Sequence, residues 1–445
     1  MGLLVLLVIS IVFIVLATAK IKLHPFLALL GAAFGFGILA RMPLKEVVAS
    51  VNAGFGGTVG TIGIVILAGA IIGAFLEQSG GALRLAERVL RITGEKQTPL
   101  AMALVGYVVS ISVFCDSAFV LLSPINKALA RKANVSLAAG AIALSLGLYS
   151  THTMVPPTPG PVGAAGVLGA DLGLVILWGL IVGSVATMTG WLFSITVASR
   201  LDLRQQDTSE PETTVSPDNM PSFTKSMVPI VLPIVLILIR SVVELPSKPL
   251  GESSLTAVLS FLGQPVVSLL IGVLFSFLLP KHFERDMLSG TGLVGKAIIS
   301  AATIIVITGA GGAFGKVLQN SGIADVIGKG FQGYESIGIL LPLVVAAGLK
   351  TAQGSSTVAM ITTAGLVTPL LPALGLDSAS AKALTVVAIG AGSMLVSHAN
   401  DSYFWVVTQF SGMTMNQGYK LQTLGTLVQG IGAAIAIGII AAVAL

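Results

Sequence analysis

Long apolar runs follow one another along almost the whole chain, separated by short groups of charged residues, glycines and prolines. The runs lie near 3–18, 23–40, 58–76, 99–130, 135–170, 172–197, 226–244, 254–279, 296–318, 336–371, 382–410 and 421–445. Because a helix needs roughly 20 apolar residues to cross the hydrocarbon core, the pattern predicts an all-α polytopic membrane protein with about ten or more spans. The first run lacks the basic leader of a signal peptide, so we expect it to be retained as a span.

One hydrophilic stretch divides this pattern into two parts. Residues 201–225 read L-D-L-R-Q-Q-D-T-S-E-P-E-T-T-V-S-P-D-N-M-P-S-F-T-K and carry no apolar run. This composition is typical of a linker between domains. We therefore expect two halves, 1–200 and 226–445.

The two halves contain matching motifs in the same order. Three pairs recur at nearly the same separation: G-A-F-L-E-Q-S-G-G (73–81) with G-A-F-G-K-V-L-Q-N-S-G (312–322), C-D-S-A-F-V (115–120) with Q-G-S-S-T-V (353–358), and Y-S-T-H-T (149–153) with V-S-H-A-N (396–400). If 99–130 and 336–371 are re-entrant hairpins, each half crosses the membrane an odd number of times. The second half is then inverted. Most Lys and Arg residues fall on the linker side, which the positive-inside rule makes cytoplasmic, with both termini on the other side.

Each half also contains an interrupted helix. S-T-H-T-M-V-P-P-T-P-G-P (150–161) breaks the run 135–170 with four prolines, and V-S-H-A-N-D-S-Y-F-W (396–405) breaks the run 382–410 with polar residues. Proline inside a helix removes a hydrogen bond and clashes with the preceding turn. Inverted repeats with broken helices are typical of secondary transporters, which bind their substrates at such breaks.

Composition supports this interpretation and excludes several others. The chain has 54% hydrophobic and 10% charged residues, a mean hydropathy of +0.97 and a net charge of +5. The basic residues are scattered, so we expect no nucleic-acid partner. Cys115 is the only cysteine, which excludes an internal disulfide and argues against a Cys-rich metal site. We expect neither a metal nor a cofactor.

Four ionisable residues lie at the interruptions: Asp116, His152, His398 and Asp401. An ionised side chain in hydrocarbon is costly, so each is a candidate functional residue. Plainer interpretations remain open. Asp116 would cap the second arm of its hairpin, Asp401 would cap the helix Ser402–Phe410, and the histidines would bond to backbone carbonyls. Lys350, near the second hairpin tip, would either neutralise a helix end or attract an anion.

Three blocks resemble the gluconate permease family of proton symporters, and the similarity extends over essentially the whole chain. The blocks are F-C-D-S-A-F-V-L-L-S-P-I-N-K-A-L-A (114–130), L-G-L-Y-S-T-H-T-M-V-P-P-T-P-G-P (146–161) and S-H-A-N-D-S-Y-F-W (397–405). The resemblance implies proton-driven uptake of a sugar acid such as gluconate across a bacterial inner membrane, which would make both termini periplasmic. It also implies the fold of the ion transporter superfamily, a homodimer whose scaffold domain carries an elevator-type transport domain.

The leading hypothesis is therefore symport of a proton with a small hydroxylated carboxylate. The substrate carboxylate would lie at half-helix N-termini and at the hydroxyls of Ser117, Thr151, Ser355, Ser356 and Thr357. The substrate hydroxyls would bond to Thr153, Thr158, His398 and Asn400. The four hydroxyls of Thr351, Ser355, Ser356 and Thr357 would otherwise only join helices.

Asp116 would carry the coupling proton, with His152 as a relay, because an ionised aspartate repels an anion whereas a protonated one donates a hydrogen bond. Asp401 is the rival carrier. Another hydroxylated carboxylate, D-serine, or sodium coupling are the alternatives. An enzyme is disfavoured because Asp116 and Asp401 lack the Y-D and G-x-G-D contexts of intramembrane aspartic proteases. A channel would leave the doubled hairpins without a purpose.

Overall fold

The computed structural model describes residues 2–93, 97–133, 135–201, 203, 220–243, 251, 253–323, 338–398 and 401–444. Within these ranges the regular elements are helices, as predicted. The first half contains α1 (Leu3–Ala19), α2 (Pro25–Leu39), α3 (Leu44–Gln78), α4 (Gly81–Thr93), α5 (Thr98–Val109), α6 (Cys115–Ala133), α7 (Leu137–Met154), α8 (Pro159–Leu168), α9 (Leu172–Thr196) and η2 (Ala198–Arg200). The second half contains α10 (Phe223–Val243), α11 (Ser254–Leu262), α12 (Pro265–Ser276), η4 (Arg285–Leu288), α13 (Leu293–Asn320), α15 (Leu340–Gln353), α16 (Ser356–Val367), η6 (Thr368–Leu370), η7 (Pro372–Leu374), α17 (Ala379–Met394), α18 (Ser402–Phe410), α19 (Met415–Gly418), η8 (Tyr419–Thr423) and α20 (Leu424–Ala444).

Helices long and apolar enough to cross a membrane are fewer than the runs suggest. Among the described residues there are four such segments, or six if each bent pair forms one span. The four are Leu172–Arg200, Phe223–Arg240, Arg285–Asn320 and Met415–Val443. Many of the remaining runs form shorter apolar helices because glycines, prolines and polar residues interrupt them.

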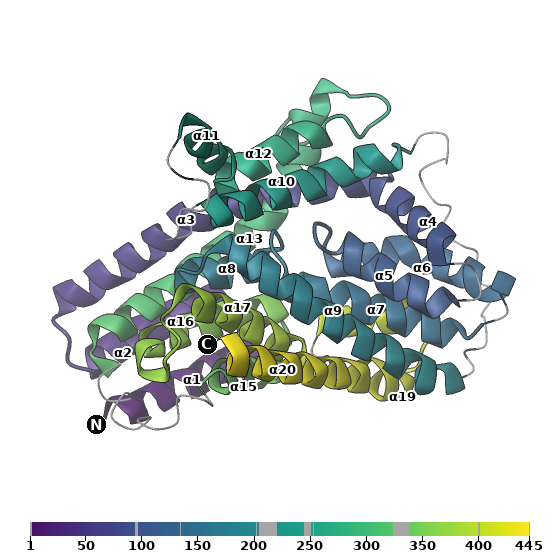
Figure 1. Cartoon of the computed structure of the whole chain (residues 1–445). Helices are drawn as coiled ribbons and strands as arrows, with labels where there is room; N and C mark the ends of the chain where they lie inside the picture. Colours follow the sequence, from purple (N-terminus) through teal and green to yellow (C-terminus); the bar gives the residue numbers. More distant parts are fainter. Residues whose placement is uncertain are drawn as a thin grey trace.

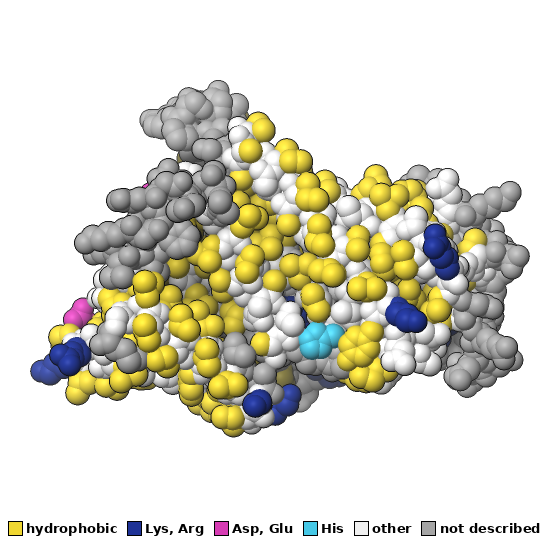
Figure 2. Space-filling model, turned by 90° about the horizontal axis from the view of Figure 1, so that it is seen from below, with side chains coloured by type: hydrophobic (Ala, Val, Ile, Leu, Met, Phe, Trp, Pro, Cys, Tyr) yellow, Lys and Arg dark blue, Asp and Glu magenta, His cyan; other side chains and the backbone are white. Residues whose placement is uncertain are grey.

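The outer surface carries apolar stripes suited to lipid. Large hydrophobic side chains on α9 are exposed at helical spacing, at Leu177, Ile181, Val185, Met188 and Leu192. Hydrophobic side chains also cover much of the face in Figure 2, with a few Lys and Arg side chains scattered among them. Because exposed apolar surface of this extent is unfavourable in water, these stripes fit a bilayer.

Short breaks separate the helices of four pairs that lie in the predicted hairpins and interrupted helices. The pairs are α5 with α6, α7 with α8, α15 with α16, and α17 with α18. Pro156 and Pro157 lie between α7 and α8, and Pro159 begins α8, where a missing N–H costs nothing. Gly354 ends α15 with a φ of 87°, a conformation that only glycine adopts without strain. Local sequence therefore fixes where these helices stop.

The centre of the molecule is formed by α7 and α17. Every residue of α7 is buried, and so is almost all of α17. Small residues let the backbones touch, because a Cβ on Gly390 would clash with the carbonyl oxygen of Thr153, and one on Gly147 would clash with that of Ala103. In Figure 1, α10, α11 and α12 lie on the opposite side of the molecule from α19 and α20.

The predicted boundary between the halves is described only in part. Of the linker 201–225, residues 202 and 204–219 lie outside the described residues. Helix α10 already begins at Phe223, within the last residues of the predicted linker.

Candidate functional site

Four half-helix N-termini lie around one buried polar cluster. The cluster consists of Lys350, Asp401, Ser397, Tyr149 and Asp116. They belong to α6, α8, α16 and α18, each of which follows a break. Helix α6 packs on α18, where the rings of Phe119 and Tyr403 lie 6.3 Å apart. Helix α8 packs on α16, where a Cβ on Gly160 would lie 3.8 Å from the Cα of Thr357. Because helix N-termini carry partial positive charge and free N–H groups, this arrangement favours an anion.

An ion pair between Lys350 and Asp401 lies at the centre of this cluster. The Lys350 ammonium is 2.6 Å from Asp401 Oδ2, and the two side chains are 1% and 6% exposed. Lys350 also donates to the carbonyl oxygen of Gly354. Ser397 donates to Asp401 Oδ2 at 2.5 Å. The pair is therefore removed from solvent and largely satisfied by hydrogen bonds.

Tyr149 connects this ion pair to the α16 terminus. Its hydroxyl lies 3.5 Å from Asp401 Oδ2 and within hydrogen-bonding range of Ser356. Its ring lies 5.9 Å from the Lys350 ammonium and packs on Tyr403 with ring centres 5.0 Å apart. A contiguous group thus runs from α15 through α18 and α7 to α16.

Asp401 also caps a helix, as one of the two interpretations predicted. Its Oδ1 accepts a hydrogen bond from the backbone N–H of Tyr403 at 3.1 Å. Capping and ion pairing use different oxygens of the same carboxylate. Neither role excludes the other.

Asp116 lies in the first turn of α6 and is partly buried. Among the described residues, its Oδ1 is buried without a hydrogen-bond partner. Asp401 and Lys350 are within electrostatic range. Ser117, the next residue, is also half-buried in the first turn of α6. A buried oxygen without a donor is unfavourable for a carboxylate, so this position suits a group that takes up a proton or a ligand.

His152 is buried in the last turn of α7, and its ring lies 6.1 Å from that of Phe114. Its Nδ1 and the Oγ1 of the neighbouring Thr151 are both buried without a partner in the described part of the chain. Thr153 and Thr158 instead donate to nearby carbonyl oxygens, at 3.0 and 2.6 Å. His152 and Thr151 can therefore still form hydrogen bonds with a ligand, whereas the hydroxyls of Thr153 and Thr158 already donate to nearby carbonyl oxygens.

The remaining predicted site residues lie at or near the α16 terminus. Ser355 caps α16 by accepting from the N–H of Val358 at 3.3 Å, and Ser356 and Thr357 follow it half-buried. His398 Nε2 lies 3.0 Å from the carbonyl oxygen of Thr351 and is half-buried. Asn400 lies outside the described residues.

Sequence reasoning did not assign Lys350 or Tyr149 to the site. It left Lys350 undecided between neutralising a helix end and attracting an anion, and it did not single out Tyr149. A signal was present for Lys350, because a buried carboxylate at Asp401 requires a buried cation and Lys350 is the lysine next to the matching break. No comparable signal marks Tyr149.

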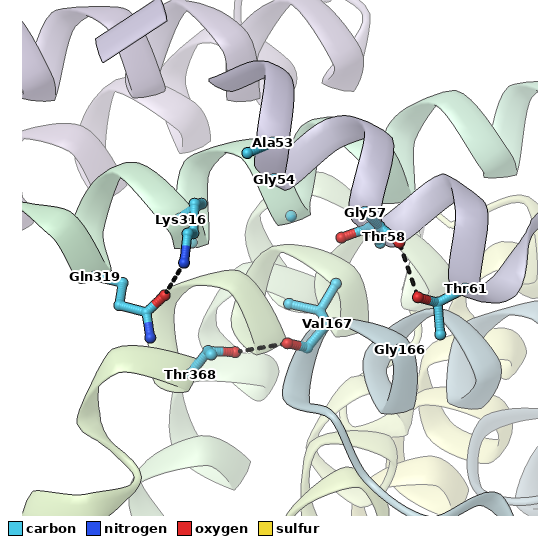
Figure 3. Close-up of a pocket in the computed structure, with 12 residues that line it drawn as sticks. Ala53, Gly54, Gly57, Thr58, Thr61, Gly166, Val167, Lys316, Gln319 and Thr368 are labelled. Atoms are coloured by element: carbon cyan, nitrogen blue, oxygen red, sulfur yellow. Dashed lines mark hydrogen bonds between the residues drawn. The ribbon is translucent and has the colours of Figure 1, made fainter. Parts of the chain in front are cut away.

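A cavity of about 290 Å³ lies away from this cluster (Figure 3). It is lined by α3, α13, the end of α8 and η6, and Lys316 donates to Gln319 Oε1 at 2.9 Å. A second cavity of about 400 Å³ is lined by Gln97, Trp191 and Ser199, among others. Neither contains a predicted site residue.

The model of the GntP family of permeases matches residues 2–443. The chain belongs to the GntP permease family. This result confirms the predicted family and indicates a multi-pass membrane transporter. Among GntP relatives, the chain is 34% identical to a gluconate permease of Pseudomonas aeruginosa, over 95% of this chain and 94% of that protein. It is 36% identical to the D-serine transporter DsdX of Escherichia coli K12, over 96% and 95%.

Solved structures show the same fold at low sequence identity. The YdaH transporter of Alcanivorax borkumensis superposes with a TM-score of 0.68 at 16% identity, covering 94% of this chain and 98% of that one. MtrF of Neisseria gonorrhoeae also gives 0.68, at 14% identity and 96% coverage of both chains. The GntP chain thus shares a transporter fold with proteins of very different sequence.

Proposed function

We propose that this GntP permease takes up gluconate or a related sugar acid together with a proton, across a bacterial inner membrane. The observation that carries the proposal is the group of half-helix N-termini around a buried cationic and acidic cluster. Such a site in an apolar protein suits a carboxylate with neighbouring hydroxyls. The gluconate permease of Pseudomonas aeruginosa is similar over nearly the whole chain.

The second candidate substrate is D-serine. The D-serine transporter of Escherichia coli is as similar to the chain as the gluconate permeases are. Gluconate and D-serine share a carboxylate and at least one hydroxyl, and the predicted hydroxyl-bearing residues would serve either. The residues of the cluster do not separate the two substrates.

In this proposal, an acidic side chain of the cluster carries the coupling proton. Asp116 and Asp401 are its two candidate carriers. His152 is the candidate relay because its buried Nδ1 has no partner among the described residues and the ring lies within electrostatic range of Asp401. Both carboxylates lie within electrostatic range of one another, so protonating one lowers the repulsion toward an incoming anion. Binding of proton and substrate is thereby coupled.

The architecture we propose is two inverted repeats. The paired breaks support it: α5–α6 and α7–α8 in the first half follow the same order as α15–α16 and α17–α18 in the second. These eight helices would form the transport domain of an elevator-type carrier. The other helices would form its scaffold and a homodimer interface, with both termini periplasmic.

Uptake into proteoliposomes under an imposed pH difference tests this function. We expect saturable accumulation of radiolabelled gluconate that collapses when the pH difference is dissipated and is unaffected when potassium replaces sodium. Saturable uptake of D-serine but not gluconate would favour the second candidate. Accumulation that follows a sodium gradient would contradict proton coupling, and uptake that never saturates would contradict a carrier.

A further inference from the structure

The proposed function assigns no role to the direct contact between Lys350 and Asp401. Both side chains are almost completely buried, and the pair joins the end of α15 to the start of α18. Burying two charges costs about as much as their attraction returns, so a buried pair is a poor way to stabilise a fold. Such a pair in a membrane interior points to a function.

We propose that Lys350 binds the carboxylate of the substrate and that Asp401 occupies its place when the site is empty. This inference rests on the proposed function and names the anion-binding group within it. Lys350 lies in the last turn of α15 and donates to the carbonyl oxygen of Gly354, the residue at the break. The N-terminus of α16 begins directly after this break, so the ammonium and the helix terminus lie on one short segment. An ammonium beside free N–H groups is a suitable carboxylate site.

The exchange moves one proton. In the empty state, the ammonium of Lys350 is neutralised by ionised Asp401. When a substrate carboxylate takes the place of Asp401, that aspartate would be left as an uncompensated buried anion, which is strongly unfavourable. It therefore takes up a proton from hydronium in the adjoining solution: one O–H bond forms on Asp401, one O–H bond of the hydronium breaks, and water is left. The site then contains Lys350⁺, the substrate anion and neutral Asp401, so it is neutral in both states.

This balance explains why proton and substrate would bind together. A protonated Asp401 without substrate leaves Lys350 as an unpaired buried cation, and substrate without the proton leaves an excess anion. Each half-loaded state is therefore disfavoured relative to the empty and fully loaded states. Symport requires this property.

Other titratable groups surround the pair and compete for the proton. Cys115 and Asp116 lie on α6, Tyr149 and His152 on α7, and Tyr403 on α18, all within electrostatic range of Lys350 or Asp401. Asp116 is the main competitor because it is the other carboxylate. Asp401 differs from Asp116 because it directly contacts the Lys350 ammonium. This is the ammonium that the substrate carboxylate would bind.

Gluconate binding to the purified protein, measured together with proton uptake in weakly buffered solution, tests the exchange. We expect the wild type to take up about one proton for each gluconate bound, and none in the presence of neutral D-glucitol. Asp401→Asn should bind gluconate without taking up a proton. The charge-balanced double variant Lys350→Gln/Asp401→Asn should bind gluconate at least about tenfold more weakly, because an ionic hydrogen bond is lost. Lys316→Gln, which removes a lysine away from the cluster, is the matched control.

If a variant fails to fold, the wild type can still overturn the exchange. Gluconate binding without proton uptake by the wild type would overturn the exchange while leaving a gluconate carrier in place. Proton uptake that persists in Asp401→Asn, or double-variant affinity equal to that of the wild type, would also overturn it. A wild type that binds no sugar acid would overturn the proposed function and this inference together.

Discussion

At the residue scale, the two aspartates of the cluster differ in their surroundings. Asp401 is bonded to Lys350, Ser397 and the N–H of Tyr403. Asp116 has a buried Oδ1 that no described residue satisfies. Sequence placed both at interruptions and took Asp116 as the leading proton carrier with Asp401 as its rival, because no Lys or Arg lies near Asp401 in the sequence and its contact with Lys350 forms only in the fold. The contacts favour Asp401 as the group that exchanges with the substrate.

The variant Asp116→Asn tests this difference between the two aspartates. We expect proton-driven gluconate accumulation to persist, and gluconate to bind roughly fivefold more tightly near neutral pH, because a charge that repels the anion is removed. Binding and accumulation are measured on the same purified preparation. The exposed Asp377→Asn is the control and should change neither. Intact binding with lost accumulation would assign the proton to Asp116 instead.

At the element scale, the turn between α15 and α16 depends on one glycine. Gly354 has a φ of 87°, and its carbonyl oxygen accepts from Lys350. The conformation of the turn therefore positions the ammonium. The sequence placed the tip of the second hairpin near this glycine, because Q-G-S-S-T-V (353–358) matches C-D-S-A-F-V (115–120) of the first half.

Gly354→Ala should therefore impair stability and transport together. A side chain in the left-handed region costs about 1–2 kcal/mol, and relieving that strain would move the carbonyl that holds Lys350. Gly169→Ala is the matched control: it has a φ of 63° at the end of α8, with open space around it. We expect a similar loss of thermal stability in both variants, but slower uptake per folded molecule only in Gly354→Ala. Equal uptake by the two would contradict a positioning role for the turn.

At the scale of the whole molecule, the sequence predicts features that depend on neighbouring residues and misses contacts between residues far apart in the chain. Helix breaks depend on prolines, glycines and caps within a few residues, and they were predicted near Pro156 and Gly354. The contact of Lys350 with Asp401 and Tyr149 joins three elements through the fold, so no local pattern contains it. Fewer helices long enough to cross a membrane occur among the described residues than the apolar runs suggested, because hydropathy does not distinguish one long helix from two short ones.

The proposed inverted arrangement makes a prediction about the two ends of the chain. In a Cys115→Ser background, Gly2→Cys and Val443→Cys should both react with a membrane-impermeant thiol reagent added to intact spheroplasts. Ser199→Cys, near the linker, should react only after the membrane is permeabilised. Labelling is measured by a shift in gel mobility. Reaction of the two ends from opposite sides would contradict an odd number of crossings in each half.

The buried pair has a consequence for the energetics of the cell. A monovalent acid anion that enters with one proton moves no net charge, and the empty site returns neutral as well. Membrane voltage, worth about 2.3 kcal/mol per charge per 100 mV, then contributes nothing to accumulation. The carrier would be electroneutral and would draw only on the difference in acidity between the two sides. A cell in alkaline surroundings would retain its voltage and still lose this route of uptake.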